Sequence, residues 1–364
     1  MKLGIIGTRG IPNYHGGFEQ FAEYFSVYMA TKGHEVYVYN SHSHPYQERI
    51  FQGVNILHQN DPEDKLGTFG QFIYDLNCIK DARKHDFDII LQLGYTSSSV
   101  WGWYLPQRPI IITNMDGLEW KRSKYSKPVR KFLKIAERLA VNTSDYLISD
   151  SVGIQKYLTK KYGSPSEYIP YGADMFLEPK EQIIAEYGQQ PFGYDMLIAR
   201  LEPENNIEVI LNGVATSEFD RPFLVIGKHE TQYGEYLKSK FINFKKIQFL
   251  GGIYNQNHLD NLRYYSNLYF HGHSVGGTNP SLLEAMASNS LIIANDNVFN
   301  RSILKEDAFY FQTVDDILRL SKLNKKDYPH YTAANSEKIK YEFSWGTINS
   351  KYENYFLKIL NESN

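Results

Sequence analysis

A polar, glycine-rich stretch runs from His271 to Ala287 and reads HGHSVGGTNPSLLEAMA. It follows an apolar run that predicts a β-strand ending at Phe270, and Pro280 stands where proline favours the start of a helix. Backbone N–H groups of such a loop and of a helix N-terminus suit the oxygens of a phosphate or a sugar. The stretch therefore predicts an anion-binding site, with Glu284 about one turn into the helix and within reach of a ribose.

Two histidines, His271 and His273, alternate in this stretch, so we expect them to face opposite sides. No third metal ligand stands near them in the sequence, and we expect neither a metal ion nor another cofactor. Asp86 and Asp88 precede the apolar run Ile89–Leu93. They therefore stand at the start of the predicted strand, whereas ligands bind at the carboxyl ends of parallel strands. We expect these two carboxylates to cap the entry to the strand.

A second glycine-rich loop, Gly7–Glu19, follows the apolar run 3–6 and contains the polar side chains of Arg9, His15 and Glu19. Glycines let the backbone approach a ligand closely, but the G-x-G-x-x-G spacing of dinucleotide sites is absent. Two interpretations stay open: a ligand-binding loop that opens a helix at about Gly17, or a plain tight turn.

Two further loops follow apolar runs. Residues 113–120 either place Asp116 at the rim of a ligand site or form an N-cap and turn cluster. Arg200 ends the run 196–199, where a guanidinium can pair bidentately with a diphosphate. The alternative for Arg200 is a surface ion pair with Glu202 or Glu204.

Short apolar runs alternate with longer stretches of helical spacing along the chain. The strand-like runs are residues 3–6, 36–39, 89–93, 110–113, 146–148, 196–199, 223–227, 247–251, 268–272 and 291–295. This alternation predicts parallel sheets with right-handed crossovers. Because the pattern restarts after a break near residues 169–174, we expect two Rossmann-like α/β domains facing a cleft: a first domain at 1–171, a second at 172–342, and a helical segment, 343–364, that packs back on the first.

The composition limits the classes of protein to consider. The 364 residues carry a net charge of −2, which argues against a general nucleic-acid binder. The sole cysteine, Cys78, excludes an intramolecular disulfide. No stretch approaches the ~20 apolar residues of a spanning helix, and the first apolar run is too short for the core of a signal peptide. A cytoplasmic protein is expected.

Together, these loops resemble those of the retaining glycosyltransferases of family 4, whose GT-B fold consists of two Rossmann-like domains. The signature of that family is a glycine loop and a helix with Glu-x7-Glu, preceded by an Arg-x4-Lys loop. Glu284 matches the second Glu and Arg200 matches the Arg. Two positions depart from the signature: Gly276 stands where the first Glu is expected, and Asn205 stands where the Lys is expected.

The motif GTRGIPNYHGGFE near the N-terminus, taken with the stretch from His271, is similar to bacterial rhamnosyltransferase-like proteins of the β-1,4-rhamnosyltransferase type. This resemblance implies transfer of L-rhamnose from dTDP-β-L-rhamnose to a glycan during capsule or surface-polysaccharide assembly. On this interpretation, Gly276 makes room for a differently oriented 6-deoxy sugar. Arg9 supplies the positive charge that Asn205 removes.

The resemblance also implies the residues of the site. The catalytic set comprises Arg9, Glu19, Asp116 and Arg200. The donor-binding set comprises Gly16, Gly17, Arg200, Asn205, Gly251, Ile253, His273, Ser274, Gly276, Gly277, Thr278, Asn279, Ser281 and Glu284. Retention by same-face substitution, in which the leaving diphosphate helps to take the acceptor proton, requires positioning and charge stabilisation rather than a protein nucleophile.

The segment Lys121–Arg138 has eight Lys or Arg residues against the single acid Glu137. It predicts either peripheral contact with an anionic membrane that holds a lipid-linked acceptor or a solvated basic helix face. Rival functions stay open as well. They are a glycosyltransferase for a UDP- or GDP-hexose, a nucleotide-sugar epimerase or hydrolase on the same fold, a sugar-nucleotide binder without activity, and a dehydrogenase.

Overall fold

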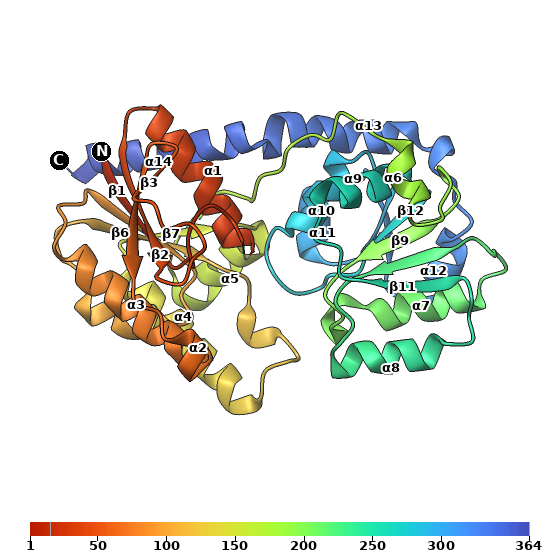
Figure 1. Cartoon of the computed structure of the whole chain (residues 1–364), viewed down its shortest axis with the longest axis horizontal. Coiled ribbons are helices and arrows are strands. Elements are labelled where there is room, and N and C mark those ends of the chain that lie inside the picture. Colours follow the sequence, from red (N-terminus) through yellow and green to blue (C-terminus); the bar gives the residue numbers. More distant parts are fainter. Residues whose placement is uncertain (15, 364) are drawn as a thin grey trace. The chain divides into compact units, whose positions relative to one another are not determined.

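The computed structural model describes residues 1–14 and 16–363 of the chain, so the predicted loop residue His15 lies outside the described residues. The backbone divides into two compact units (Figure 1). The first unit combines Met1–Trp120, Tyr125–Tyr171 and Trp345–Asn364, and the second combines Lys121–Lys124 and Gly172–Ser344.

A single mixed sheet forms the centre of the first unit. Its strands are β1 (Lys2–Ile6), β2 (Glu35–Ser41), β3 (Ile50–Phe51), β4 (Val54–Gln59), β5 (Ile89–Leu93), β6 (Ile110–Met115), β7 (Tyr146–Ser149) and β8 (Glu167–Tyr168). Their order is β3-β4-β2-β1-β5-β6-β7-β8. The described pairs are parallel except for β3 with β4. The loops after β1, β5 and β6 therefore leave the sheet at the same edge.

Helices cover both faces of this sheet. They are α1 (Gly17–Thr31), α2 (Glu63–Leu66), α3 (Thr68–Ala82), η1 (Ser99–Tyr104), η2 (Glu119–Lys121), α4 (Lys127–Thr143), α5 (Val152–Tyr162) and α14 (Trp345–Ser363). Because successive strand residues point to opposite faces, Ile5 packs in the core beneath α1 and α14, and Ile6 packs in the core beneath α3.

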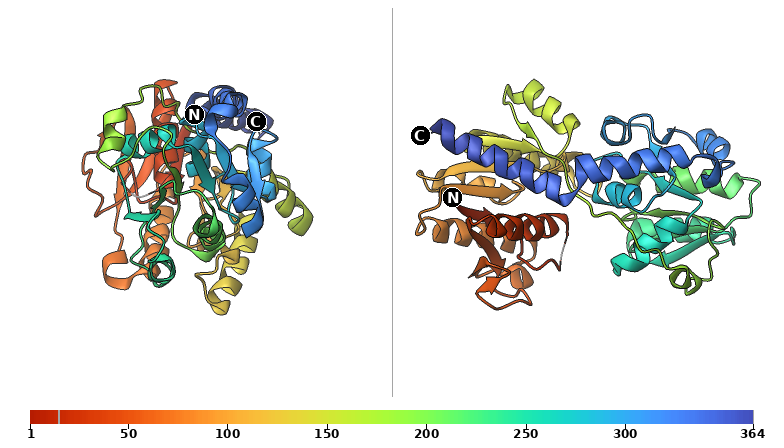
Figure 2. Two further views of the ribbon diagram at one scale, coloured as in Figure 1. Left: turned by 90° about the vertical axis from the view of Figure 1, so that its right-hand side faces the viewer. Right: turned by 90° about the horizontal axis from the view of Figure 1, so that it is seen from above.

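The helix α14 belongs to the first unit although it follows the second unit in sequence. Its aromatic side chains pack on those of α1, as in the pair of Phe25 and Tyr352, whose ring centroids lie 5.1 Å apart. Figure 2 shows α14 running alongside α1. The residues Trp345, Tyr352 and Phe356 are all buried in the core of the first unit.

The second unit is built on a parallel sheet. Its strands are β9 (Asp195–Ile198), β10 (Phe223–Ile226), β11 (Ile247–Gly251), β12 (Leu268–His271), β13 (Ile292–Asn295) and β14 (Phe309–Phe311), in the order β11-β10-β9-β12-β13-β14. The order reverses between β9 and β12, and in open parallel sheets such a reversal marks the usual position of a ligand site.

The sheet of the second unit also has helices on both faces. They are α6 (Glu181–Ala185), η3 (Pro203–Asn205), α7 (Ile207–Thr216), α8 (Gln232–Phe241), α9 (Gln256–Tyr265), α10 (Pro280–Ala287), α11 (Val298–Leu304), α12 (Val314–Leu320), η4 (Lys325–Asp327), α13 (Pro329–Lys338) and η5 (Ile339–Phe343). The helices α7, α8 and α12 share one apolar core with the strands. Figure 1 shows α6, α9 and α10 on the opposite face.

The predicted α/β class with parallel sheets is confirmed. Each predicted strand is present, and the bounds of β5 and β11 agree with the prediction at both ends. The strands β3, β4, β8 and β14 were not predicted, and neither was α3. Among the residues that the structure describes, none of the helices combines the length and the apolar character needed to cross a bilayer.

Candidate functional site

The predicted loop between strand and helix lies at the carboxyl edge of the second sheet. The strand β12 ends at His271, one residue later than predicted, and α10 begins at Pro280 as predicted. Asn279 caps the helix, because its side-chain oxygen accepts a hydrogen bond of 2.9 Å from the backbone N–H of Ser281. Residues 272–279 thus form an ordered approach to a helix N-terminus.

The loop after β9 holds this glycine loop in place. The backbone N–H and the hydroxyl of Ser274 both donate to the carbonyl oxygen of Glu204, at 3.2 and 2.6 Å. Asn205 donates its side-chain amide to the carbonyl oxygen of Arg200 at 2.8 Å, while the Arg200 side chain is exposed. The structure therefore brings the predicted residues Arg200, Asn205 and Ser274 together, with Asn205 fixing the backbone that carries Arg200.

Gly276 has a backbone conformation that favours glycine. Its φ is +127°, in the region that L side chains rarely adopt, whereas a Cβ added there would meet no atom within 4 Å. Steric crowding therefore does not explain the glycine, but backbone strain does. The family signature has a glutamate at this position. In the loop conformation observed at Gly276, the backbone of a glutamate would be strained.

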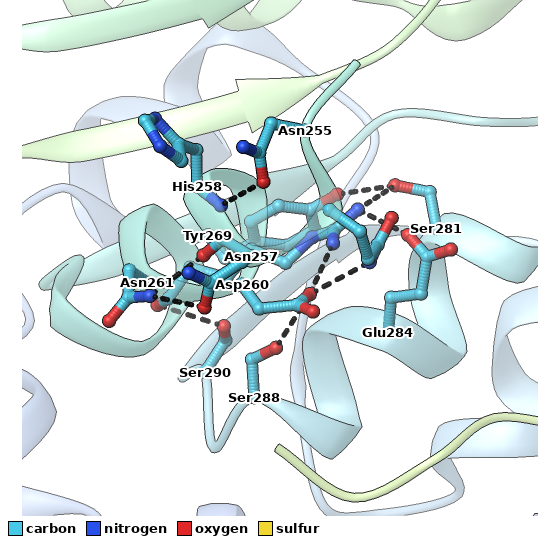
Figure 3. A network of polar contacts seen from close by, with 12 residues as sticks. Asn255, Asn257, His258, Asp260, Asn261, Tyr269, Ser281, Glu284, Ser288 and Ser290 are labelled. Atoms are coloured by element: carbon cyan, nitrogen blue, oxygen red, sulfur yellow. Dashed lines mark hydrogen bonds and ion pairs between the residues drawn. The ribbon is translucent and has the colours of Figure 1, made fainter. Parts of the chain in front are cut away.

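Glu284 is held by a buried arginine that the sequence analysis missed. Arg263 on α9 is 1% exposed, and its guanidinium donates to Glu284 Oε2 at 2.5 Å and to Asp260 Oδ1 at 2.9 Å. Ser281 joins the network, since its hydroxyl accepts from Arg263 at 3.3 Å and bonds with the Tyr269 hydroxyl at 2.9 Å. Figure 3 shows Asp260, Tyr269, Ser281 and Glu284 gathered in this network. Glu284 retains 23% exposure, so its carboxylate is both anchored and reachable.

The expectation that His271 and His273 face opposite sides is wrong. Their rings stack with centroids 4.4 Å apart, because the strand ends at His271 and the alternation of a strand no longer applies. Burial lowers the pKa of His271 well below its ordinary value. Burial, and next the positive charge of Arg200, lower the pKa of His273 to about 3. Both rings are therefore neutral at physiological pH.

The strand β11 contributes the third loop of this edge. Gly251 is its last residue, and its carbonyl oxygen accepts a hydrogen bond of 2.9 Å from the backbone N–H of Gly227. Ile253 follows two residues later and is half-buried. The structure thus places these two residues, which were predicted to bind the donor, at the same edge as the glycine loop.

The first loop of the first unit is built on two buried polar side chains. Asn40 accepts from the Ile11 N–H at 3.1 Å and donates to the Ile11 carbonyl at 2.8 Å. A Cβ on Gly10, whose φ is +127°, would lie 2.3 Å from the Asn40 side chain. Glu19 is 7% exposed and accepts a hydrogen bond of 3.0 Å from the Arg9 N–H. The carboxylate of Glu19 therefore holds the loop, next to Gly16 as the N-cap of α1 and Gly17 as its first residue.

Arg9 and Asp116 line a polar cavity of about 180 Å³ in the first unit. Arg9 forms a forked ion pair with Glu63 of α2, with hydrogen bonds of 2.9 and 2.8 Å from Nε and Nη2. The Oδ1 atom of Asp116 accepts a hydrogen bond of 2.7 Å from the Gly117 N–H. The structure therefore places Asp116 at the lining of this cavity, with its side chain bonded to the backbone of the next residue.

Sequence reasoning missed a buried acid of this cavity, Asp75 on α3. Its side chain accepts a hydrogen bond of 2.5 Å from the Ser97 hydroxyl. Burial raises the pKa of Asp75 from 3.8 to about 7, against the lowering effects of Ser97 and Arg9. The signal in the sequence was a carboxylate inside the mostly apolar stretch Phe72–Cys78, but that stretch was not recognised as a helix.

The two acids at the start of β5 have structural partners. The Lys2 N–H donates to Asp88 at 2.6 Å, and Arg108 pairs with Asp86 at 2.7 Å. The prediction of capping is confirmed for Asp88, which bonds to the first residue of β1, whereas Asp86 forms an exposed ion pair instead. Among the described residues, no three His, Cys, Asp or Glu side chains are grouped so that they could hold a metal ion.

Comparisons with known proteins agree with this arrangement of elements. A family model described as a domain of unknown function, DUF1972, matches residues 1–174. No curated protein matches the chain.

Three solved structures share the fold across nearly their whole length. Sucrose-phosphate synthase from Thermosynechococcus elongatus has a TM-score of 0.80 at 16% identity, covering 99% of both chains. HepE from Anabaena, in complex with UDP and glucose, has a TM-score of 0.74 at 14% identity, covering 97% of this chain and 98% of its own. A glycosyltransferase from Rickettsia africae has a TM-score of 0.72 at 14% identity, covering 98% of both chains. At these identities the likeness establishes the fold, which is the GT-B fold of glycosyltransferases.

Proposed function

We propose that the chain is a glycosyltransferase that moves a sugar from a nucleotide-sugar donor to a hydroxyl group of a glycan acceptor. The observation that carries the proposal is the anchored carboxylate of Glu284 beside the glycine loop 272–279, at the reversal of strand order in the second sheet. A loop of N–H donors beside a fixed, partly exposed carboxylate suits a ligand with a phosphate at one end and a ribose at the other.

The roles within the donor site follow from this geometry. Arg200, exposed and carried on a backbone that Asn205 fixes, would pair with the diphosphate, together with the amides of Gly277, Thr278 and Asn279. Glu284 would accept the ribose hydroxyls. Neutral His273 would act as a hydrogen-bonding group rather than as a cation, since its pKa is lowered to about 3.

A likeness in fold supports this choice of ligand. The HepE structure has the same fold and is described as a complex with UDP and glucose. We infer that the second unit of this chain takes a nucleoside diphosphate sugar of the same chemical class. Chemistry would then proceed through positioning and charge stabilisation, without a metal ion, and with retention of the anomeric configuration.

For the transferred sugar we propose L-rhamnose from dTDP-β-L-rhamnose, as in the family 4 rhamnosyltransferase-like proteins that the motifs resemble. The absence of a carboxylate at Gly276 and the open space around that position support a sugar that lacks the usual hexose contact. Arg9, Glu19 and Asp116 would serve the acceptor side, with Glu19 acting through the backbone that it holds.

We further propose that the acceptor is linked to a lipid and that the enzyme works at the cytoplasmic face of an anionic membrane. The helix α4 supports this proposal because Lys131, Lys134 and Arg138 are exposed on it together with Ile135, which is 51% exposed. Cations beside an exposed apolar side chain are typical of a helix that lies on a membrane surface.

A thermal-shift screen against dTDP-, UDP- and GDP-sugars tests the proposed function. A donor that binds the native state raises the melting temperature, and a concentration of 100 times its Kd stabilises the fold by about 2.7 kcal/mol. We expect a dTDP-sugar to give the largest shift in the wild type and Arg200→Ala to remove most of it. The matched control is Arg319→Ala, which removes an exposed arginine of α12.

Product analysis then separates transfer from the rival activities. A glycosyltransferase consumes donor in proportion to acceptor, an epimerase converts donor without acceptor, and a non-catalytic binder converts none. If no nucleotide sugar shifts the melting temperature, the proposal fails. If the donor is isomerised without an acceptor, the chain is an epimerase rather than a glycosyltransferase.

A further inference from the structure

The proposed donor site lacks one of the two cations of the family signature. Arg200 is the arginine of that signature, but Asn205 stands in place of the lysine. Asn205 is 6% exposed and donates its amide to the Arg200 carbonyl oxygen, so it holds the backbone and brings no charge. Arg9, which we expected to supply this charge, belongs to the first unit and pairs there with Glu63. A second cation within the second unit would have to come from another segment.

The segment Lys121–Lys124 brings three cations to the second unit. It reads KRSK, and it belongs to this unit although the residues before and after it in the sequence belong to the first. Lys121 and Lys124 are exposed, whereas Arg122 between them is half-buried. Arg122 is therefore the cation of this segment that packs against protein.

A hydrogen bond ties this segment to the loops of the proposed donor site. The Ser123 hydroxyl donates to the side-chain carboxylate of Glu204. The backbone carbonyl oxygen of the same Glu204 accepts from the N–H and from the hydroxyl of Ser274, at 3.2 and 2.6 Å. Glu204 thus joins the residue that follows Arg122 to the glycine loop 272–279.

The positive charge of Arg122 acts on this glycine loop. Burial lowers the pKa of His273 most, and the charges of Arg200 and then of Arg122 lower it further. Charges in salt solution act over distances of about 8–10 Å, so both guanidinium groups lie near the same imidazole ring. The loop therefore has two arginines beside it, from two separate segments of the chain.

Two arginines match the charge of the group that the proposed donor would place here. A diphosphate with a substituent at each end carries two negative charges, one on each phosphoryl group. A guanidinium has five N–H donors in a planar fork, and one forked ion pair uses two of them. An arginine that is held by the protein therefore still has N–H groups for the oxygens of a phosphate.

We propose that Arg122 is the second cation of the diphosphate site, where the family signature has a lysine, and that Ser123 and Glu204 position it. This inference deepens the proposed function and rests on it for the identity of the donor. The binding of a diphosphate group rests on the arrangement of Arg122, Arg200 and the glycine loop 272–279.

Isothermal titration calorimetry on the full chain tests the proposal, with inorganic pyrophosphate as the probe in buffer without divalent cations. Arg122→Ala should weaken pyrophosphate binding about tenfold, as expected for the loss of one charge-assisted contact. Arg122→Lys keeps the charge but loses the fork, so it should recover part of the affinity. The matched control is Lys124→Ala, which removes an exposed cation of the same segment and should change the affinity by less than about twofold.

Three results would overturn the proposal. They are equal affinity in Arg122→Ala and the wild type, an equal loss in Lys124→Ala, and no binding of pyrophosphate by the wild type. If Arg122→Ala does not fold, Arg122→Met replaces it, because methionine keeps most of the aliphatic stem and removes the charge.

A double-mutant cycle shows whether Ser123 acts through Arg122. Ser123→Ala removes the hydrogen bond to Glu204 and should weaken pyrophosphate binding roughly threefold. The double variant Ser123→Ala/Arg122→Ala should bind no more weakly than Arg122→Ala alone, because the tether has no effect without the arginine. Additive losses would contradict the positioning role of Ser123.

The thermal-shift screen with nucleotide sugars separates this inference from the proposed function. If pyrophosphate binds as expected and no nucleotide sugar binds, the anion site stands and the glycosyltransferase fails. If a nucleotide sugar binds equally well to the wild type and to Arg122→Ala, the glycosyltransferase stands and the role of Arg122 is refuted.

Discussion

Arg263 carries a positive charge in a place that is 1% exposed to solvent. An isolated buried charge is strongly destabilising, so it requires acidic partners with good geometry. Asp260 and Glu284 are these partners, at 2.9 and 2.5 Å. The same bond that stabilises the arginine also fixes the direction of the Glu284 carboxylate, and this makes Arg263 a positioning residue for the proposed donor site.

Replacing Arg263 by Met should lower both stability and donor affinity. Loss of one partner of a buried ion pair typically costs about 3–5 kcal/mol, and a released Glu284 should weaken binding of dTDP or UDP roughly tenfold. Isothermal titration calorimetry measures the affinity. Arg221→Met is the matched control, because Arg221 pairs with Asp195 at the first residue of β9, at the opposite end of the strands. Equal affinity loss in both variants would show that Arg263 acts through stability alone.

Asp75 should make the first unit less stable as the pH rises. Its pKa is about 7 in the folded chain against 3.8 for the ordinary group, so the folded state favours the proton. The stabilisation from this proton is fully present below about pH 4 and is lost as the pH rises to about 7, by an amount on the order of a few kcal/mol.

Urea unfolding at pH 5 and pH 7.5 measures this effect. We expect the difference in unfolding free energy between the two pH values to shrink in Asp75→Asn, which cannot ionise, and to match the wild type in the exposed control Asp64→Asn. The same pH dependence in Asp75→Asn and in the wild type would contradict the assignment.

At the scale of elements, the sequence predicted most of the strands, but it missed β4 inside the first sheet and β3, β8 and β14 at the edges of the sheets. The strands β5 and β11 agree with the apolar runs 89–93 and 247–251 at both ends, because β5 is buried throughout and β11 ends at Gly251 with Gly252 after it. The edge strands β3 and β8 have two residues each, which is too short for a periodic pattern to emerge. The strands β3 and β8 are defined by their hydrogen bonds to neighbouring strands rather than by a pattern in their own sequence.

The sequence predicted only those parts of the candidate site that depend on residues close together in the chain. The helix start at Pro280 follows from residue type and spacing, and so does the capping by Asp88. The partnership of Arg263 with Glu284 joins residues 21 positions apart. The cavity around Asp75 joins residues from the loops after β1, β4, β5 and β6 and from the helices α1, α2 and α3. Such pairings depend on the packing of distant segments, and no window of sequence contains them.

The basic helix α4 offers a test at this scale. Reversing two exposed charges in Lys131→Glu/Arg138→Glu should weaken co-sedimentation with vesicles rich in phosphatidylserine, since each basic residue near such a surface contributes about 1 kcal/mol. Lys156→Glu/Lys160→Glu on α5 is the matched control, because it changes two exposed lysines of another helix in the same unit. Equal binding of the α4 variant and the wild type would remove the membrane proposal.

At the scale of the whole molecule, the chain leaves the first unit at Tyr171 and returns to it at Trp345. The core of that unit is shared between segments at opposite ends of the sequence. Phe21 and Phe25 of α1 contact Tyr352 of α14, at centroid distances of 4.7 and 5.1 Å. Neither segment can bury its apolar face without the other.

Ending the chain at Ser344 should therefore destabilise the first unit. Removing a single buried aromatic side chain costs about 3–5 kcal/mol, and α14 contributes Trp345, Tyr352 and Phe356 to the core. We expect the truncated chain to lose hydrogen-exchange protection in α1 and β1, while the strands of the second unit keep theirs. Ending the chain at Leu360 is the control. Full protection of α1 in the shorter chain would show that α14 is dispensable.

The return of α14 also has a consequence for the order of events at the ribosome. The segments up to Tyr171 emerge first, but the helix that covers the aromatic face of α1 is made only after the residues of Gly172–Ser344. At about 5–20 residues per second, that delay is roughly 10–35 s. During that interval the nascent first unit has an uncovered aromatic surface, which is the kind of surface that chaperones bind and that drives aggregation. The speed at which the second unit is translated sets how long this surface stays uncovered. That speed should therefore affect the yield of folded protein more than the stability of the second unit alone would suggest.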